Sequence, residues 1–318
     1  MKRIISLLLI ILIGLNMTAC KNNKKYKELN IAIQYGLPYA PLEIMKDNKV
    51  LETELKGIKI NYIKVSNTAA IREAMVSGDI DIGFMAIPPF LVGSDNGMKW
   101  KIISGLSSSE SLLLTYNKEI NSVKDLGENH KIALPQPGSV QHILLAMELE
   151  KLGLEPRSLD KNLLTLSHPD GMSLLLSKND VTAHFTTPPY STEELKHKEI
   201  HSVLTGKEAF GGDFTFIVGA VSEKYYKNNK ETTEIVKNSI KEAIDYIYKN
   251  KKSVSLSLGK SYNMPGSDIE EYLDKNYISY NTDVVGVEKF SDFMEKAGFI
   301  KNKIDYKNLY IHGDKNEK

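Results

Sequence analysis

Short apolar runs alternate with amphipathic segments along the first third of the chain. The runs at 29–33, 58–65 and 80–84 are rich in branched aliphatic residues, which predicts β-strands. Between them, residues 42–50 and 69–76 place apolar side chains at steps of three and four, which predicts helices. Strands that alternate with helices favour right-handed crossovers and a largely parallel sheet.

The same pattern returns one hundred residues later. Over residues 163–185 a strand, a polar turn at 167–171, a helix at 172–176 and a second strand follow in the same order. Both copies end alike, with Ile-Pro-Pro-Phe at 87–90 and Thr-Pro-Pro-Tyr at 187–190. This match predicts two similar α/β lobes; two unrelated α/β stretches in one sheet are the alternative.

A strand, turn and helix at 131–153 form the sharpest local motif. Residues 131–134 predict a buried strand, and 140–152 predict an amphipathic helix that Gly153 ends. Ser139 is a natural N-cap for that helix. The first-turn amides would then face the carboxyl edge of the strand, where open α/β sheets bind ligands. A purely structural cap is the alternative interpretation.

The N-terminus predicts a secretory leader. Two basic residues precede an aliphatic run of about 12 residues, which is too short for a permanent membrane span. Cys20, the single cysteine of the chain, follows small residues as in a bacterial lipobox, so we expect cleavage and lipidation there. A plain signal peptide with an incidental cysteine is the alternative. Residues 21–27 are polar and basic, which predicts a flexible tether.

Composition narrows the function classes. Hydrophobic residues make up 42% of the chain and charged residues 25%, as in soluble globular proteins. The 41 basic and 40 acidic residues leave a net charge of +1, which argues against a nucleic-acid partner. With 318 residues the chain is long enough for two lobes.

The order of four motifs resembles a known family. They are Gly-Leu-Pro-Tyr-Ala-Pro-Leu at 36–42, Ala-Met-Val-Ser-Gly-Asp-Ile-Asp-Ile-Gly-Phe at 74–84, Val-Lys-Asp-Leu-Gly at 123–127, and Pro-Gly-Ser with Gln-His at 137–142. The sequence from about Leu29 to Tyr190 is thereby similar to the ABC-importer binding proteins for sulfonates, taurine, nitrate or thiamine precursors. The resemblance implies a type II periplasmic-binding-protein fold: a two-lobed α/β clamshell, with a largely parallel mixed sheet and flanking helices in each lobe.

The resemblance also implies that the chain crosses twice between the lobes. We expect the crossings in the β-rich segments 112–116 and 214–221, so that residues 28–113 plus 217–318 form one lobe and residues 114–216 the other. The C-terminal part predicts helices at 231–251, 267–276 and 287–297, with Ser267 or Asp268 as a cap and Gly298 as a stop. Trp100 is expected to be half-buried at a sheet edge.

The implied function is capture of a small ligand by hinge closure and delivery to an ABC permease and its ATPase, by a monomer anchored through lipid to the outer face of the cytoplasmic membrane. The residues expected to line the cleft lie at strand ends and turns: Gln34, Tyr35, Tyr39, Asn67, Thr68, Ala86, Ser108, Ser139, His142, His168, Phe185 and Thr186. The cleft segments contain no lysine or arginine, while Tyr35, Tyr39, Phe185 and Tyr190 offer aromatic faces. We therefore expect a neutral or singly charged ligand with a planar or aliphatic body.

Two other functions are weighed against binding. The same fold hosts enzymes of pyrimidine and menaquinone precursor pathways, but the chain has neither their cysteine-rich iron motif nor a partnered nucleophile. A non-transport surface lipoprotein is the second alternative, and the chain shows no repeats or low-complexity stalk that would favour it. No cofactor is expected. His197 and His201 have the spacing of two metal ligands, but the lysines around them favour a solvated face, and His184 could face the cleft or the core.

Overall fold

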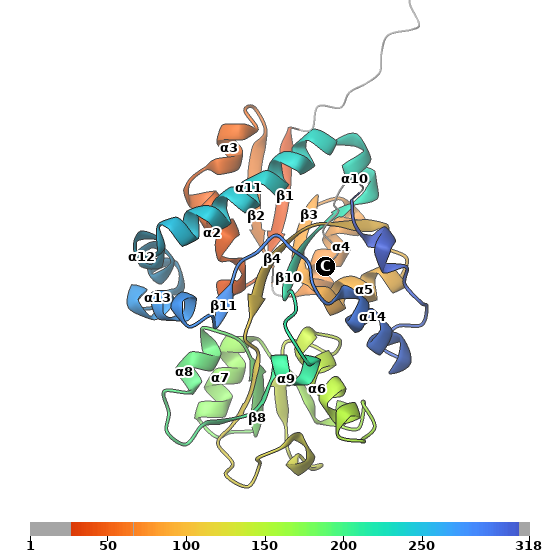
Figure 1. The fold of residues 1–318 in the computed structure, drawn as a ribbon, viewed down its shortest axis with the longest axis vertical. Coiled ribbons are helices and arrows are strands. Elements are labelled where there is room, and N and C mark those ends of the chain that lie inside the picture. Colours follow the sequence, from red (N-terminus) through yellow and green to blue (C-terminus); the bar gives the residue numbers. More distant parts are fainter. Residues whose placement is uncertain (1–26, 66, 312–318) are drawn as a thin grey trace, which may run out of the picture.

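Two β-sheets, one above the other in Figure 1, organise the computed structural model, which describes residues 27–65 and 67–311. The predicted leader, Cys20 and nearly all of the predicted tether lie outside the described residues. The first sheet has the order β11-β4-β10-β3-β1-β2. Its strands are β1 (Glu28–Ile33), β2 (Lys59–Lys64), β3 (Ile82–Ala86), β4 (Trp100–Ser109), β10 (Ile217–Ser222) and β11 (Ile278–Ser279).

The second sheet has the order β7-β6-β8-β5-β9. Its strands are β5 (Leu112–Thr115), β6 (Ile132–Leu134), β7 (Leu163–Thr165), β8 (Ala183–Thr186) and β9 (His201–Thr205). In each sheet three parallel strands are extended by two more strands through two successive antiparallel pairings. Strands β1, β2, β3, β10 and β4 of the first sheet are matched in this way by β6, β7, β8, β5 and β9 of the second. The expectation of two similar α/β lobes is confirmed by this shared topology.

The chain passes between the sheets at two places. It leaves the first sheet after Ser109 and enters the second at Leu112, then leaves the second after Thr205 and returns at Ile217. The lobe boundary predicted at 113/114 therefore falls within β5. The apolar run 112–115 fits a buried strand of either sheet, so the sequence alone does not say which sheet it joins.

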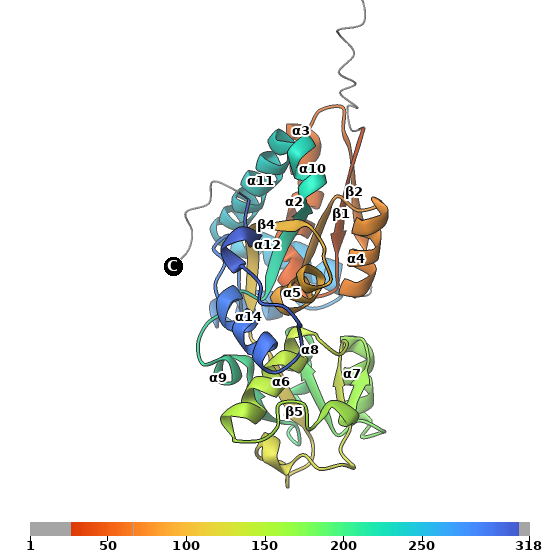
Figure 2. The same cartoon turned by 90° about the vertical axis from the view of Figure 1, so that its right-hand side faces the viewer.

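Helices cover the first sheet on both faces (Figures 1 and 2). They are η1 (Leu37–Tyr39), α2 (Ala40–Asp47), α3 (Val50–Glu54), α4 (Thr68–Ser77), α5 (Ile87–Asp95), α10 (Glu223–Asn228), α11 (Lys230–Lys249), α12 (Lys251–Tyr262), α13 (Gly266–Asp274), α14 (Val287–Lys296) and η4 (Tyr306–Leu309). The long helix α11 buries Val236, Ile240 and Ile247 against α2, α3 and β4, as its spacing predicts.

Three details of this C-terminal part differ from the sequence prediction. The predicted helix 231–251 ends two residues early, at Lys249, and α12 follows it almost at once, because Asn250 leaves the helical conformation. Neither Ser267 nor Asp268 caps α13: the cap position is Pro265, so both residues lie inside the helix. Gly298 does follow the end of α14, with a φ of 71° that favours glycine.

The second sheet carries η2 (Val123–Asp125), α6 (Val140–Lys151), η3 (Asp160–Asn162), α7 (His168–Leu176), α8 (Tyr190–Glu194) and α9 (Gly206–Phe210). Ser139 caps α6 and Gly153 follows its end, as predicted. Helix α7, however, begins at His168 instead of 172. Ser167 caps it, and Pro169 and Asp170 suit a first helical turn, so the predicted polar turn is itself helical.

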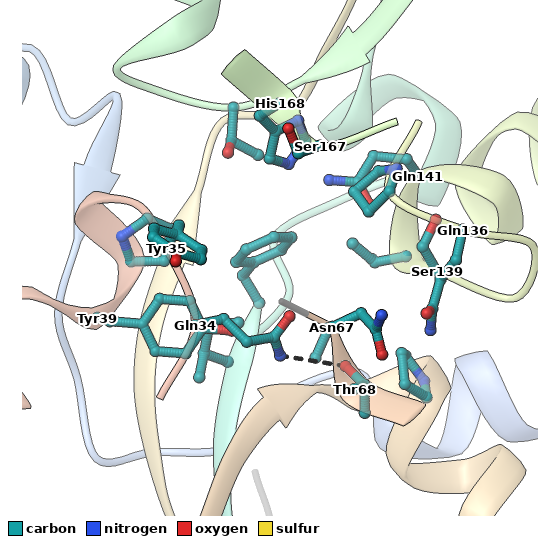
Figure 3. A pocket seen from close by; sticks show the side chains of 18 of the residues that line it. Gln34, Tyr35, Tyr39, Asn67, Thr68, Gln136, Ser139, Gln141, Ser167 and His168 are labelled. Carbon is teal, nitrogen blue, oxygen red and sulfur yellow. Dashed lines mark hydrogen bonds between the residues drawn. The ribbon is translucent and has the colours of Figure 1, made fainter. Parts of the chain in front are cut away.

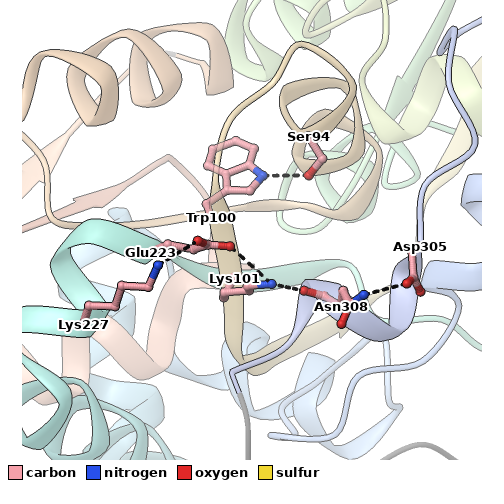
Figure 4. A network of polar contacts seen from close by, with 7 residues as sticks. All are labelled: Ser94, Trp100, Lys101, Glu223, Lys227, Asp305 and Asn308. Atoms are coloured by element: carbon pink, nitrogen blue, oxygen red, sulfur yellow. Dashed lines mark hydrogen bonds and ion pairs between the residues drawn. The ribbon is translucent and has the colours of Figure 1, made fainter.

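Trp100 is buried, with 2% of its surface exposed, and not half-buried as predicted. It stacks on Phe90 of α5 at 4.8 Å, and its indole N–H donates to Ser94 Oγ at 2.8 Å. The neighbouring Lys101 pairs with Glu223 and donates to the carbonyl of Asn308, which ties the C-terminal segment to the first sheet (Figure 4). Helix α5 covers the tryptophan, a tertiary contact that no local sequence pattern indicates.

Candidate functional site

A cavity of about 470 Å³ lies between the two sheets and is lined by residues from both (Figure 3). Eight of the twelve residues predicted for the cleft line it: Gln34, Tyr35, Tyr39, Asn67, Thr68, Ala86, Ser139 and His168. They come from strand ends and helix starts in both lobes. A pocket of this size accommodates a small organic molecule.

The first wall of the cavity is formed by the carboxyl ends of β1 and β3. Gln34 follows β1 and donates through Nε2 to Thr68 Oγ1 at 3.1 Å. Tyr39 is buried, and its burial raises the pKa of the phenol well above its ordinary value, so the hydroxyl stays protonated. Tyr35 is the exposed member of this wall, with 56% of its surface accessible.

Two tyrosines from distant parts of the chain hold the turn that carries Tyr39. Tyr262 donates to the carbonyl of Gly36 at 3.0 Å, and Tyr280 donates to the carbonyl of Leu37 at 3.0 Å. Gly36 has a φ of 107°, a conformation that side chains rarely adopt. The turn is therefore fixed by its glycine and by the helical C-terminal part of the same lobe.

Four helices begin at the cavity. Asn67, Ala86, Ser139 and Ser167 are the N-cap residues of α4, α5, α6 and α7, and each of them lines the cavity. The side chains of Asn67, Ser139 and Ser167 accept hydrogen bonds from their first-turn amides. The helix N-termini carry partial positive charge, and first-turn amides of α4, α6 and α7 remain for an anionic or polar ligand group. Pro88 and Pro89 remove two of the first-turn amides of α5.

The cavity wall carries no full charge. None of its described residues is lysine, arginine, aspartate or glutamate; His168 and the tyrosines are its titratable groups. The apolar part of the wall is supplied by prolines and larger side chains, namely Pro38, Pro89, Pro135, Val140, Pro169, Phe216 and Ile217. The arrangement suits a ligand with an apolar body and at most one weakly solvated charge.

His142 was predicted to line the cleft, but it faces the other side of α6. Its Nδ1 accepts from the amide of Gly138 at 2.9 Å, and its Nε2 pairs with Asp160 at 2.9 Å. The ring also packs edge-on against Phe299. Burial lowers the pKa of His142, with Asp160 acting in the opposite direction. Gln141, one residue earlier and about 100° around the helix, lines the cavity instead.

Three other predicted residues also lie outside the cavity wall. Ser108 donates to the carbonyl of Phe214 at 2.9 Å, so the returning crossing segment covers it. Phe185 is fully buried in the core of the second lobe. Thr186 lies behind the wall, where its hydroxyl contacts His168 Nδ1 at 3.0 Å.

The twelve predicted residues leave out several that line the cavity, including Gln136, Gln141, Ser167, Thr187, Phe216 and Ile217. The repeat could have indicated Ser167, because it occupies in α7 the capping position that Asn67 occupies in α4. Phe216 and Ile217 lie where the chain returns to the first sheet. That the return passes the cavity depends on tertiary packing, which no local signal reveals.

His197 and His201, whose spacing would suit two metal ligands on one helical face, do not share a helix. His201 begins β9 and its Nε2 contacts the carbonyl of Ile120 at 2.8 Å, while His197 lies in the preceding turn. Across residues 27–65 and 67–311, no group of three histidine, cysteine, aspartate or glutamate side chains is placed to hold a metal ion. The helices within these ranges are all too short or too polar to span a membrane.

Comparison with protein families gives a match to the NMT1-like family over residues 22–256, well over half of the chain. The chain belongs to the NMT1-like family. Among curated proteins, this NMT1-like chain is 25% identical over 223 residues to the taurine-binding periplasmic protein of Escherichia coli strain K12. That match covers 68% of the chain and 65%, just under two thirds, of the relative's own length.

Solved structures establish the fold of this NMT1-like protein. The alkanesulfonate-binding protein from Xanthomonas axonopodis pv. citri, bound to MOPS, is similar with a TM-score of 0.75 and 19% identity, over 90% of this chain and 98% of that one. The periplasmic aliphatic sulphonate-binding protein from Escherichia coli matches with a TM-score of 0.72 and 20% identity, over 89% and 97%. The two-lobed periplasmic-binding-protein fold expected from the sequence is confirmed.

Proposed function

We propose that this protein is the extracytoplasmic solute-binding component of an ABC importer, which captures a small organic monoanion of the sulfonate type and releases it unchanged to a permease. The observation that carries the proposal is the uncharged cavity between the sheets, at which four helices begin. The relatives described as taurine- and alkanesulfonate-binding proteins support this ligand class.

The charge of the wall limits the ligand. With neither basic nor acidic side chains among the described lining residues, a multiply charged anion would lose its hydration without a counter-charge. A monoanion could be held by helix N-termini and hydroxyl groups, each helix contributing about 0.3–1 kcal/mol. Its aliphatic or planar body would pack on Tyr39, Phe216 and the prolines of the wall.

Capture would proceed by closure of two lobes. Gln34 and Thr68 come from the first lobe, Ser139 and His168 from the second, and all line one cavity. Residues 110–111 and 211–216 connect the lobes, so a rotation at these two passages would open and close the cavity. For the lobes we propose residues 28–109 with 217–311, and 112–210, because α9 packs on α6 and β9 of the second lobe.

Calorimetry and thermal unfolding with a ligand panel test the proposal. The panel contains C2–C4 alkanesulfonates, taurine, nitrate and hydroxymethylpyrimidine. We expect at least one organic ligand to bind and to raise the melting temperature, because a ligand specific for the folded state stabilises it by mass action. Binding of inorganic oxyanions alone, or of no compound in a broader metabolite screen, would refute the proposed ligand class. Turnover of a bound compound would favour the enzyme alternative.

The proposed membrane anchor rests on Cys20 and the aliphatic run before it. In a bacterial host, the wild-type chain should incorporate a labelled fatty acid and fractionate with membranes. Cys20→Ser should lose the label and leave the membrane fraction. Equal labelling of both forms would contradict lipidation at this position. Light scattering of the purified soluble part should give a monomer.

A further inference from the structure

A chain of buried polar side chains runs from the cavity wall into the second lobe. His184 Nδ1 lies 2.6 Å from Glu194 Oε1, and His184 Nε2 lies 3.4 Å from His168 Nδ1. Thr186 Oγ1 also lies 3.0 Å from His168 Nδ1. His184 and Glu194 have no exposed surface, while His168 lines the cavity (Figure 3). His168 is therefore the one of these four side chains that a ligand in the cavity could contact.

The protonation of Glu194 can be argued from its contacts. Its Oε2 is buried without a hydrogen-bond partner among the described residues, and no lysine or arginine pairs with either oxygen. A carboxylate so placed would be costly, whereas a neutral carboxylic acid leaves only a carbonyl oxygen unpaired. Burial accordingly raises the pKa of Glu194 to about 8. The acid then donates its proton to His184 Nδ1.

This donor fixes both imidazole rings. With Nδ1 accepting from Glu194, neutral His184 carries its proton on Nε2 and points it at His168 Nδ1. The Thr186 hydroxyl can donate to the same nitrogen. His168 Nδ1 is thus an acceptor, and the proton of a neutral His168 lies on Nε2, which has no hydrogen-bond partner among the described residues.

The surroundings keep His168 neutral. Helix α7 packs on β6, β8 and α8. Besides His168, the titratable groups of α7 and of these three elements are Asp170, Tyr190, Glu193 and the His184–Glu194 pair. Asp170 bonds to Ser167 and Glu193 pairs with Lys196, while the ring of Tyr190 stacks on that of His168 with 5.6 Å between the ring centres. Tyr35 and Tyr39 share the cavity from the other lobe. Burial and the adjacent His184 lower the pKa of His168 to about 3.

We propose that His168 determines specificity in the cavity as a neutral N–H donor of fixed tautomer, which selects a hydrogen-bond acceptor group such as a sulfonate oxygen. Glu194, through His184, is the positioning residue behind it. This inference rests on the proposed function and adds an orientation to it: the acidic headgroup lies at the start of α7, and the body of the ligand lies toward Tyr39 and Phe216. A ligand whose headgroup is only a donor, such as an alkylammonium ion, leaves the Nε2–H unpaired and is rejected.

Long-range ¹H–¹⁵N spectra of the histidine rings, recorded without ligand, test the tautomer directly. We expect His168 and His184 to be neutral and protonated on Nε2 between about pH 5 and 7, with free histidine in the same buffers as the titrating reference. His168→Gln identifies the His168 signal. A His168 protonated on Nδ1, or one that titrates with the reference, would overturn the inference.

Binding of three probes of matched size tests the specificity. We expect ethanesulfonate and ethyl methyl sulfone to bind and ethylammonium to be rejected. His168→Met should weaken the binding of ethanesulfonate by roughly ten- to a hundredfold, the usual effect of losing a hydrogen bond to a charged group. Glu194→Met should remove the tautomer preference of His184 and His168 and weaken the binding of ethanesulfonate. Glu194→Gln should keep both the tautomer and the affinity of the wild type, because its amide can donate to His184 Nδ1. Glu242→Gln, on the exposed face of α11, is the matched control.

The outcomes separate the two proposals. If neither acceptor probe nor any compound of the panel binds, the proposed function fails, while the ring spectra still decide the state of His168. If ethanesulfonate binds equally well to His168→Met and to wild type, with both proteins folded, the inference fails and the proposed function stands. Equal affinity for ethylammonium would likewise contradict it.

Discussion

The side-chain amide of Gln34 donates a 3.1 Å hydrogen bond to the hydroxyl oxygen of Thr68 at the edge of the cavity. This bond uses the hydroxyl as an acceptor, so its hydrogen remains available to a ligand in the cavity. It also leaves the carbonyl oxygen of Gln34 free to accept. The pair therefore offers one donor and one acceptor from the first lobe, opposite His168.

Replacement of Thr68 by valine keeps its shape and removes the hydroxyl. We expect the affinity of Thr68→Val for the ligand to fall about five- to thirtyfold, corresponding to about 1–2 kcal/mol, because the amide of Gln34 also loses its partner. Calorimetry measures the change. Thr53→Val is the control, since Thr53 bonds to the carbonyl of Lys49 on an exposed helix far from the cavity. Equal effects of both substitutions would show that Thr68 has no special role in binding.

The sequence predicted the elements around this pair more reliably than the elements after residue 222. The strands and helices from β1 to β3 follow clear periodicities, and Asn67, Thr68 and Gln34 fall at their ends, where ligands of α/β sheets bind. Eight of the twelve residues predicted from such ends and turns do line the cavity.

The errors have physical causes that a local pattern does not contain. His142 and Gln141 are adjacent in sequence, and only the rotation of α6 against Phe299 decides which of them faces the cavity. Phe216 lines the cavity because the second crossing passes it, which depends on contacts between distant segments. Strand β8 is buried along its whole length, so alternation could not tell whether Phe185 faces the cavity or the core.

Helix caps at the cavity should affect both stability and binding, whereas a remote cap should affect stability alone. Ser139 accepts from the amide of His142 at the start of α6, and Ser222 accepts from the amide of Tyr225 at the start of α10. We expect Ser139→Ala and Ser222→Ala each to lower the free energy of unfolding by about 1 kcal/mol.

The two cap variants should differ in affinity. Ser139 lines the cavity and Ser222 does not, so only Ser139→Ala should weaken binding, by roughly five- to tenfold for one lost hydroxyl contact. Urea unfolding and calorimetry on the same preparations measure both quantities. A similar loss of affinity in Ser222→Ala would mean that stability, and not contact with the ligand, controls the binding.

Gly171 allows His184 to pack against α7. A Cβ at this position would lie 2.6 Å from His184 Nε2, far inside van der Waals contact. We expect Gly171→Ala to destabilise the fold by about 1–3 kcal/mol through overpacking and to displace the ring that faces His168. Gly127→Ala is the control, because nothing lies within 4 Å of the added Cβ. Thermal unfolding measures the stability of both variants. Equal melting temperatures would contradict the close packing of His184 against Gly171.

The buried side chains of Glu194, His184 and His168 should also give the free energy of unfolding a maximum near pH 6.5. Burial raises the pKa of Glu194 from 4.5 to about 8 and lowers the pKa values of His184 and His168 from 6.5 to about 3. Above pH 6.5 the folded state keeps a proton on Glu194 that the unfolded state has lost, so stability falls as the pH rises toward 8. Below pH 6.5 the two histidines of the unfolded state bind two protons that the folded state excludes, whereas the folded state keeps only one extra proton, on Glu194. The unfolded state therefore binds more protons, and stability falls as the pH decreases.

Glu194→Gln isolates the alkaline side of this profile. The amide cannot lose a proton, so the variant should lose no stability from this group between about pH 6.5 and 8, where the wild type should lose up to about 1.4 kcal/mol per pH unit from it. The free energy of unfolding of the variant should instead rise slightly and level off, because the two histidines of the unfolded state lose their last protons in this range. The acidic side should remain, because His184 and His168 are unchanged. Urea unfolding at fixed ionic strength measures both profiles, with Glu242→Gln as the exposed control. If Glu194→Gln shows the same fall in stability between pH 6.5 and 8 as the wild type, another group titrates in this range. That result would remove the support that a neutral Glu194 gives to the tautomer of His168.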